Sequence, residues 1–424
     1  MQSVASQNAP SPKILIPHFV FGGFTWLIAT ILIIFSPDAF VQHYFNPKLL
    51  SITHLLVLGW ITMIIFGALY QLIPVILEVK LYSERLAFIS FIFLASGAVS
   101  LSVSFWNFWI GTPIYFSATL VIIAVILFAL NIFLTANKSK KENIEKDFIL
   151  TAVSWLLFTV GAGLTLAINL THPFLSPPIT ELLKLHAHAG IVGWVLQLTI
   201  GVSSHLLPMF MVSHNLNKKK LNFAYYFINV GLIIGIVFLF VQWQPGVMIG
   251  VLSVVAGIIC FLSFQFEAYK KRVRKQLDIG MKQSALSFIF LIVALILVLV
   301  LTIGFKKIIF ITLPMAIAYG SLLLLGFISS LIMGQTYKTL PFIIWLKVYR
   351  NRVGKGKIPF PKNLYSEQMA NLQLCLFATG IITLLSGIII KYTSVVSAGG
   401  IILFCSVLLY NLNILKIIFH KPAF

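Results

Sequence analysis

The sequence predicts an all-α membrane protein with twelve transmembrane helices, and three observations support this fold class. Hydrophobic residues make up 59% of the chain, whereas charged residues make up only 9%. Apolar runs recur along the chain at about 20 residues each, the length that a helix needs to cross a hydrocarbon core of roughly 30 Å. These runs lack the alternating pattern of barrel strands, and a helix satisfies its own backbone hydrogen bonds in lipid.

Twelve such runs are present, and we expect one membrane-spanning helix from each. They lie at 14–36, 50–77, 86–107, 113–136, 148–170, 180–211, 222–242, 246–266, 283–304, 308–335, 370–390 and 395–416. The first run is long and lacks a small-residue cleavage site, so we expect a span there and no cleaved signal peptide. We interpret residues 1–424 as a single integral membrane domain.

The distribution of lysine and arginine predicts the orientation of the spans. With the N-terminus inside, 25 of the 30 basic residues fall on the inner side, and the others are Lys48, Lys184, Lys306, Lys307 and Lys391. This bias places both termini in the cytoplasm and the protein in the cytoplasmic (inner) membrane, with membrane lipid around it. The net charge of +20 is dispersed over seven inner segments, which predicts no nucleic-acid binding. The basic run at 270–276 is interpreted as an orienting loop, with contact to anionic lipid headgroups as the alternative.

Four sequence features recur with one period and predict an internal repeat. A glycine followed by an aromatic residue is followed eight residues later by a second glycine and, seven residues further on, by a proline. The three copies contain Gly59-Trp60, Gly67 and Pro74; Gly193-Trp194, Gly201 and Pro208; and Gly326-Phe327, Gly334 and Pro341, with Tyr70, Ser204 and Tyr337 at one further shared position. We therefore expect three pseudo-symmetric four-helix repeats, at about 14–136, 148–266 and 283–417, in which spans two, six and ten are equivalent. Small residues there predict close approach, either to a flat group or in ordinary helix packing.

Three histidines lie near the outer ends of two equivalent spans. His54 and His188 share one repeat position, five residues before the first glycine, and His186 lies two residues before His188. Histidine at membrane depth usually has a partner or a function, and neutral imidazole is a common metal ligand. We therefore predict that His54 and His188 ligate one heme b between spans two and six. The alternative is that these histidines are hydrogen-bonded core residues.

His186 is predicted to point elsewhere, because residues two apart project about 200° from one another around a helix. We expect it to face a gap toward span ten, where Tyr319 and Ser321 occupy the corresponding repeat positions. A second heme or metal with an open coordination position could bind there and take a diatomic gas, with Tyr319 as a hydrogen-bond donor. An inner site formed by His18 and His205 is a further alternative.

These motifs resemble the catalytic subunit (subunit I) of the heme-copper oxidase and nitric oxide reductase superfamily, over nearly the whole chain. HAHAGIVGW at 186–194 is similar to the heme motif of that family, and MGQTYKTLPFIIW at 333–345 is similar to the end of its tenth span. THLLVLGWITMIIFGALYQLIP at 53–74 is similar to motifs of its small stand-alone relatives. The resemblance implies that His54 is the heme ligand of span two, and that an electron donor or an accessory subunit is a partner.

The chain departs from this family at the copper site. The family carries a pair of heme-ligating histidines on span ten and its copper ligands on spans six and seven, whereas here the pair lies on span six. Tyr319 and Ser321 stand on span ten, and the seventh span at 221–242 contains no histidine. A copper centre of the family type therefore lacks its ligands.

The positions of the acidic residues argue against two classes of proton-translocating protein. All ten acidic residues fall in loops or at helix ends: Asp38, Glu78, Glu84, Glu142, Glu145, Asp147, Glu181, Glu267, Asp278 and Glu367. This argues against a proton-pumping oxidase and a proton-driven carrier. We expect a heme-binding membrane protein that acts in electron transfer or in handling nitric oxide or oxygen. There are two alternatives. One is a full terminal oxidase or nitric oxide reductase, which is an oxidoreductase, with an atypical metal site; the other is a non-heme membrane carrier or scaffold. Repeats of four spans share one orientation, unlike the inverted repeats of many carriers.

Overall fold

The protein, described by a computed structural model over residues 8–304, 309–350 and 358–422, is built from helices, and these ranges contain no β-strand. Twelve helices in the described residues are long and apolar enough to cross a membrane, which confirms the predicted fold class. In chain order they are α2 (Pro12–Phe35); α3 (Pro47–His54), η2 (Leu55–Thr62) and α4 (Met63–Leu77) as one span; α5 (Glu84–Trp106); α6 (Thr112–Ala136); α7 (Ile144–Thr171); α8 (Ile179–His188), η3 (Ala189–Leu196) and α9 (Gln197–Met211) as one span; α10 (Lys219–Phe240); α11 (Gln244–Lys270); α12 (Ile279–Leu299) with η4 (Val300–Gly304); α13 (Ile309–Ser321), η5 (Leu322–Ile328) and α14 (Ser329–Tyr349) as one span; α15 (Glu367–Ile390); and α16 (Thr393–Ile418).

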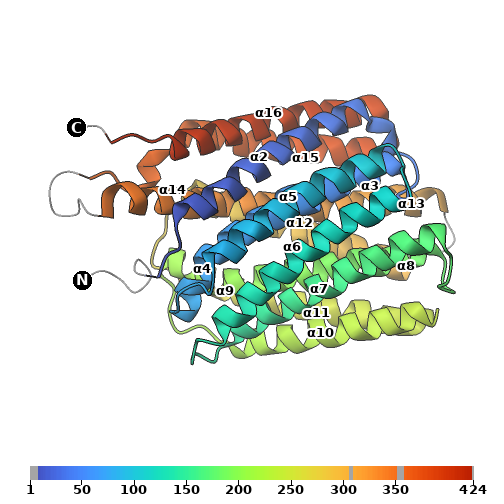
Figure 1. Ribbon diagram of the computed structural model, residues 1–424, viewed down its shortest axis with the longest axis horizontal. Coiled ribbons are helices and arrows are strands. Elements are labelled where there is room, and N and C mark those ends of the chain that lie inside the picture. The colour runs from blue at the N-terminus through green and yellow to red at the C-terminus, as the bar shows by residue number, and fades with distance from the viewer. Residues whose placement is uncertain (1–7, 305–308, 351–357, 423–424) are drawn as a thin grey trace. The chain divides into compact units, whose positions relative to one another are not determined.

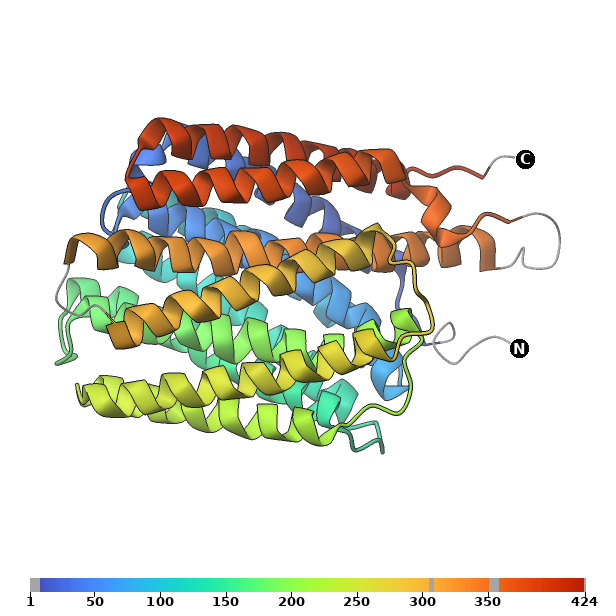
Figure 2. The same cartoon turned by 180° about the vertical axis from the view of Figure 1, so that it is seen from behind.

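The chain divides into two compact units. Unit 1 comprises Met1–Val75, Leu94–Phe108 and Asp278–Phe424, and unit 2 comprises Ile76–Phe93 and Trp109–Leu277. Within unit 1, α2 packs against α16, and α15 and α16 lie side by side. The start of α2 and the end of α16 lie at the same end of this unit (Figure 1). Within unit 2, α10 and α11 lie side by side (Figures 1 and 2).

Local sequence signals explain where several helices begin. The Asn46 side chain accepts hydrogen bonds from Lys48 N and Leu49 N at the start of α3, with a proline in the first turn. The Asn143 and Asp278 side chains cap α7 and α12 in the same way. Such side chains satisfy amide groups that have no partner in the first turn of a helix. The starts of these spans are therefore set locally, by short polar residues that precede an apolar run.

The tenth span is the main departure from the predicted boundaries, because it continues to Tyr349 and does not end at residue 335. Two polar side chains at and after residue 335 find partners on α12 or at its N-cap. Gln335 Nε2 donates to Ser284 Oγ at 2.7 Å, and Lys338 pairs with Asp278. Pro341 lies inside the helix, as Pro74 and Pro208 do in theirs. Lys306 and Lys307, assigned to an outer loop, lie outside the described residues, as do Arg352, Lys355 and Lys357 of the inner segments.

The repeated glycines face the preceding span in each case. A methyl group on Gly67 would lie 2.6 Å from His18 Cβ of α2, and one on Gly201 would lie 2.8 Å from Phe148 Cβ of α7. A methyl group on Gly334 would lie 2.7 Å from the Gly280 carbonyl oxygen of α12. The glycine that opens each copy of the repeat also faces the preceding span. The atoms nearest to an added Cβ on Gly59, Gly193 and Gly326 belong to α2, α7 and α12 respectively. These contacts are the ordinary glycine-mediated helix packing that the sequence left open as an alternative.

Candidate functional site

Three of the candidate positions directly precede a π-helical segment. His54 precedes η2, His188 precedes η3 and Ser321 precedes η5. The starts of the three segments are 134 and 133 residues apart, the same spacing as the prolines. Segments of this kind are rare and are found frequently at functional sites. A fourth, η4, follows α12.

Hydroxyl groups satisfy carbonyl oxygens in two of these segments. Thr25 Oγ1 donates to the Gly59 carbonyl oxygen of η2 at 2.6 Å. Ser329 Oγ donates to the Leu324 carbonyl oxygen of η5 at 2.7 Å and accepts from Trp60 Nε1 at 3.0 Å. In unit 1 the Trp60 indole therefore links span two to span ten, and η2 and η5 are in contact. Carbonyl groups that lie outside the regular α-helical hydrogen-bonding pattern need donors such as these hydroxyl groups at membrane depth.

His54 is the last residue of α3 and is half-buried in unit 1. Its Nδ1 lies 2.8 Å from the Leu50 carbonyl oxygen, one helical turn earlier. Its ring stacks on Phe105 of α5, with a centroid distance of 4.6 Å. A carbonyl oxygen can only accept, so the ring proton is on Nδ1 and the lone pair of the neutral imidazole is on Nε2. This is the tautomer that ligates a metal through Nε2.

His188 is the last residue of α8 and is half-buried in unit 2. Its Nδ1 lies 2.8 Å from the Lys184 carbonyl oxygen, again one turn earlier in the same helix. The two histidines of the shared repeat position therefore have the same backbone hydrogen bond, the same tautomer and the same π-helical segment after them.

His186 contacts a different helix. Its Nδ1 lies 3.1 Å from the Thr159 carbonyl oxygen of α7, and a methyl group on Gly163 would lie 3.0 Å from its Cε1. The two histidines of the HAH motif thus have different neighbours, as their angular separation predicts. The sequence named span ten as the neighbour of His186, whereas its contacts within unit 2 are with span five. Gly163, which has no side chain, makes room for this imidazole.

The other two candidate residues predicted near the outer ends of the spans, Tyr319 and Ser321, lie on α13. This helix belongs to unit 1, as His54 does. Tyr319 is half-buried, and Ser321 is buried. His186 and His188 belong to unit 2. Among the described residues, no group of three or more His, Cys, Asp or Glu side chains is placed to hold a metal ion. A pair of axial imidazoles, which is enough for heme, needs no third protein ligand.

The two inner histidines lie in different surroundings. His18 is fully buried in unit 1, where its Nδ1 lies 2.9 Å from the Ile14 carbonyl oxygen and its ring packs edge-on against Tyr70. His205 is half-buried on α9 in unit 2.

Glu145 is a buried ionisable residue that the sequence did not single out. It lies in the first turn of α7, only 2% exposed, and its Oε1 pairs with Lys218 Nζ at 2.8 Å. Gly201 of α9 lies opposite this turn, because a methyl group there would lie 3.2 Å from the Glu145 backbone carbonyl oxygen. No local sequence signal indicated that this carboxylate would be covered.

No model of a known protein family matches the chain, and no curated protein matches it in sequence.

Proposed function

We propose that the protein is an integral membrane heme protein of the oxidase-subunit-I type, with His54 and His188 as axial ligands of a b-type heme. The matched environment of these two histidines supports the proposal most strongly. They share a repeat position, a 2.8 Å bond from Nδ1 to the carbonyl oxygen four residues earlier, and a π-helical segment that begins at the next residue. His18 makes the same kind of bond to Ile14, and Ser321 also precedes a π-helical segment, so it is the combination of these features at one repeat position that supports the proposal.

The ring orientation suits this role. An imidazole that donates from Nδ1 to a backbone carbonyl is fixed in one orientation, and its Nε2 becomes a better donor to a metal. A heme with two imidazole ligands carries one electron by changing between its ferric and ferrous states. Electron transfer is therefore the function that this ligand pair supports best, with an electron donor or an accessory subunit as the partner.

A second heme or metal at His186 is less well supported. Its Nδ1 bond to Thr159 and its contact with Gly163 hold this ring in the packing between α8 and α7. We therefore assign one heme, and retain Tyr319 and Ser321 as candidates for contact with a diatomic gas. His186 also supplies a matched control, because it lies on the same helix as His188 and is likewise half-buried.

Heme content of the purified protein tests this proposal. After expression with ample heme, pyridine hemochrome analysis is expected to give one heme b per chain in the wild type and in His186→Ala. His54→Ala and His188→Ala are each expected to lose the low-spin spectrum of a two-imidazole heme. A wild-type protein that is folded and free of heme would contradict the proposal, and so would a His186→Ala variant that loses heme as fully as His188→Ala does.

A further inference from the structure

One end of unit 2 concentrates positive charge where α10 begins and α11 ends. Residues 213–220 and 263–277, which we call the basic platform, contain eight basic residues and one acidic residue. These are Lys218, Lys219, Lys220, Lys270, Lys271, Arg272, Arg274 and Lys275, with Glu267 as the carboxylate. Lys218 pairs with Glu145 of α7. The platform therefore keeps a large excess of positive charge after its ion pairs are formed.

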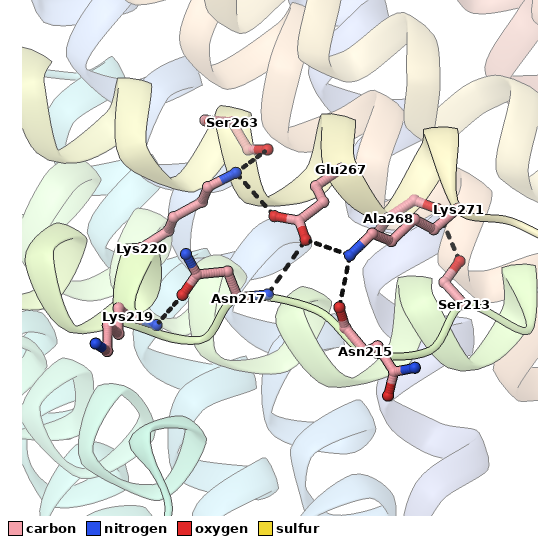
Figure 3. A network of polar contacts seen from close by, with 9 residues as sticks. All are labelled: Ser213, Asn215, Asn217, Lys219, Lys220, Ser263, Glu267, Ala268 and Lys271. Carbon is pink, nitrogen blue, oxygen red and sulfur yellow. Dashed lines mark hydrogen bonds and ion pairs between the residues drawn. The ribbon is translucent and has the colours of Figure 1, made fainter.

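The platform is held in a fixed geometry by its single carboxylate (Figure 3). Glu267 accepts hydrogen bonds from Lys220 Nζ and Lys271 Nζ, each at 2.8 Å, and from the backbone amide of Asn217 at 3.3 Å. Ser213 Oγ donates to the Ala268 carbonyl oxygen at 2.7 Å. The segment that precedes α10 is thereby fastened to the last turns of α11. A site that is ordered before a ligand arrives loses less entropy on binding.

Two cations of the platform lie over aromatic rings that are themselves exposed. Lys270 Nζ lies 4.6 Å from the ring centroid of Phe266, and the Arg272 guanidinium carbon lies 3.7 Å from that of Tyr269. Phe266 is 57% exposed and Tyr269 is 42% exposed. Aromatic rings are enriched at the boundary between acyl chains and headgroups, where their apolar faces remain in contact with lipid. Cations held over such rings are suited to meet the phosphates of the headgroups.

Arg272 and Lys219 differ in how their charged groups are held. Arg272 Nη1 donates to the Tyr269 carbonyl oxygen at 2.6 Å, which fixes the guanidinium over the ring, and its Nε is buried. Lys219 is exposed, and its ammonium group reaches none of the other residues drawn in Figure 3. The positive charge of the guanidinium still attracts a phosphate, although its Nε is covered.

We propose that the basic platform binds the phosphate headgroup of an anionic membrane lipid. Arg272 and Lys270 contact the phosphate, Phe266 and Tyr269 lie against the upper acyl chains, and Lys219 adds electrostatic attraction. A loop that only orients the protein in the membrane requires positive charge. It does not require cations stacked on exposed rings or a carboxylate that fixes the loop. The proposal is independent of heme binding.

Lipid titration monitored by native mass spectrometry tests the proposal on the full chain in a zwitterionic detergent. Phosphatidylglycerol is the probe, and phosphatidylcholine with the same acyl chains and inorganic phosphate are the comparison arms. Each cation near an anionic headgroup strengthens binding about fivefold, so the double variant Lys270→Gln/Arg272→Gln is expected to bind phosphatidylglycerol about 25-fold more weakly. Lys347→Gln/Lys362→Gln is the matched control, because it removes two exposed cations from unit 1.

Wild type and control are expected to bind phosphatidylglycerol equally and to prefer it to phosphatidylcholine. An equal loss in both double variants would show nonspecific charge attraction and overturn the proposal. Equal binding of the two lipids would overturn it as well, and displacement of phosphatidylglycerol by inorganic phosphate would identify a free-anion site. If Lys270→Gln/Arg272→Gln fails to fold, Lys219→Gln/Lys270→Gln replaces it, since both side chains are exposed. Unchanged binding in that variant would equally overturn the proposal.

Discussion

A single methyl group at Gly334 tests the close approach between α14 and α12. An added Cβ would lie 2.7 Å from the Gly280 carbonyl oxygen, whereas ordinary contact begins at 3.4 Å. The reciprocal distance, from a Cβ on Gly280 to the Gly334 carbonyl oxygen, is 2.6 Å. Both neighbours are backbone atoms, so neither can move aside by changing a side-chain rotamer. The two helices must separate by roughly 0.7 Å, and overpacking of this kind costs about 1–3 kcal/mol.

Thermal unfolding of Gly334→Ala in detergent, followed by circular dichroism, measures this cost. Gly161→Ala is the matched control, because Gly161 is an exposed helical residue with no atom within 4 Å of its added Cβ. Alanine favours the helix over glycine by about 0.8–1.0 kcal/mol, so the control is expected to melt at or above the wild-type temperature and Gly334→Ala below it. If Gly334→Ala were as stable as Gly161→Ala, the backbone contact between α12 and α14 would be refuted.

Two further substitutions probe polar contacts in the separate units. Ser329→Ala removes the acceptor of Trp60 Nε1 and the donor to the Leu324 carbonyl oxygen. We expect this substitution to lower the free energy of unfolding by about 1–3 kcal/mol. Ser100→Ala is the control and should cost much less, because the Ser100 hydroxyl is exposed and bonds within its own helix. Lys218→Gln leaves the buried Glu145 carboxylate without its ion-pair partner, so it should lower the melting temperature more than Lys219→Gln does. Equal effects of the paired substitutions in either comparison would count against the contact concerned.

The spans were predictable because the length and polarity of each run are local properties of the sequence. The end of span ten was not, because it depends on tertiary partners. Lys338 and Gln335 mark an exit from the membrane when they are considered alone, yet Asp278 and Ser284 accommodate them and the helix continues through Pro341. The burial of Glu145 was missed for the same reason, since its ion-pair partner Lys218 belongs to a segment far along the chain.

The candidate site was predictable in part. The common period identified His54 and His188 as equivalent, but no sequence signature indicated that a π-helical segment begins after each of them. Helical geometry predicted that His186 and His188 diverge, but the identity of the neighbour of His186 depends on the packing of α7 and α8. The glycines were interpreted correctly as sites of close approach, and only the structure assigned that approach to the preceding span.

Rescue of ligand-deleted variants by free imidazole tests most directly whether His54 and His188 ligate heme iron. In His54→Ala and in His188→Ala, loss of one axial ligand is expected to change a low-spin visible spectrum into a high-spin one. Added imidazole should restore the low-spin spectrum in both variants, while His186→Ala should remain low-spin without it. A low-spin spectrum that persists in either of the first two variants without added imidazole would contradict the assignment of these two residues as the axial pair.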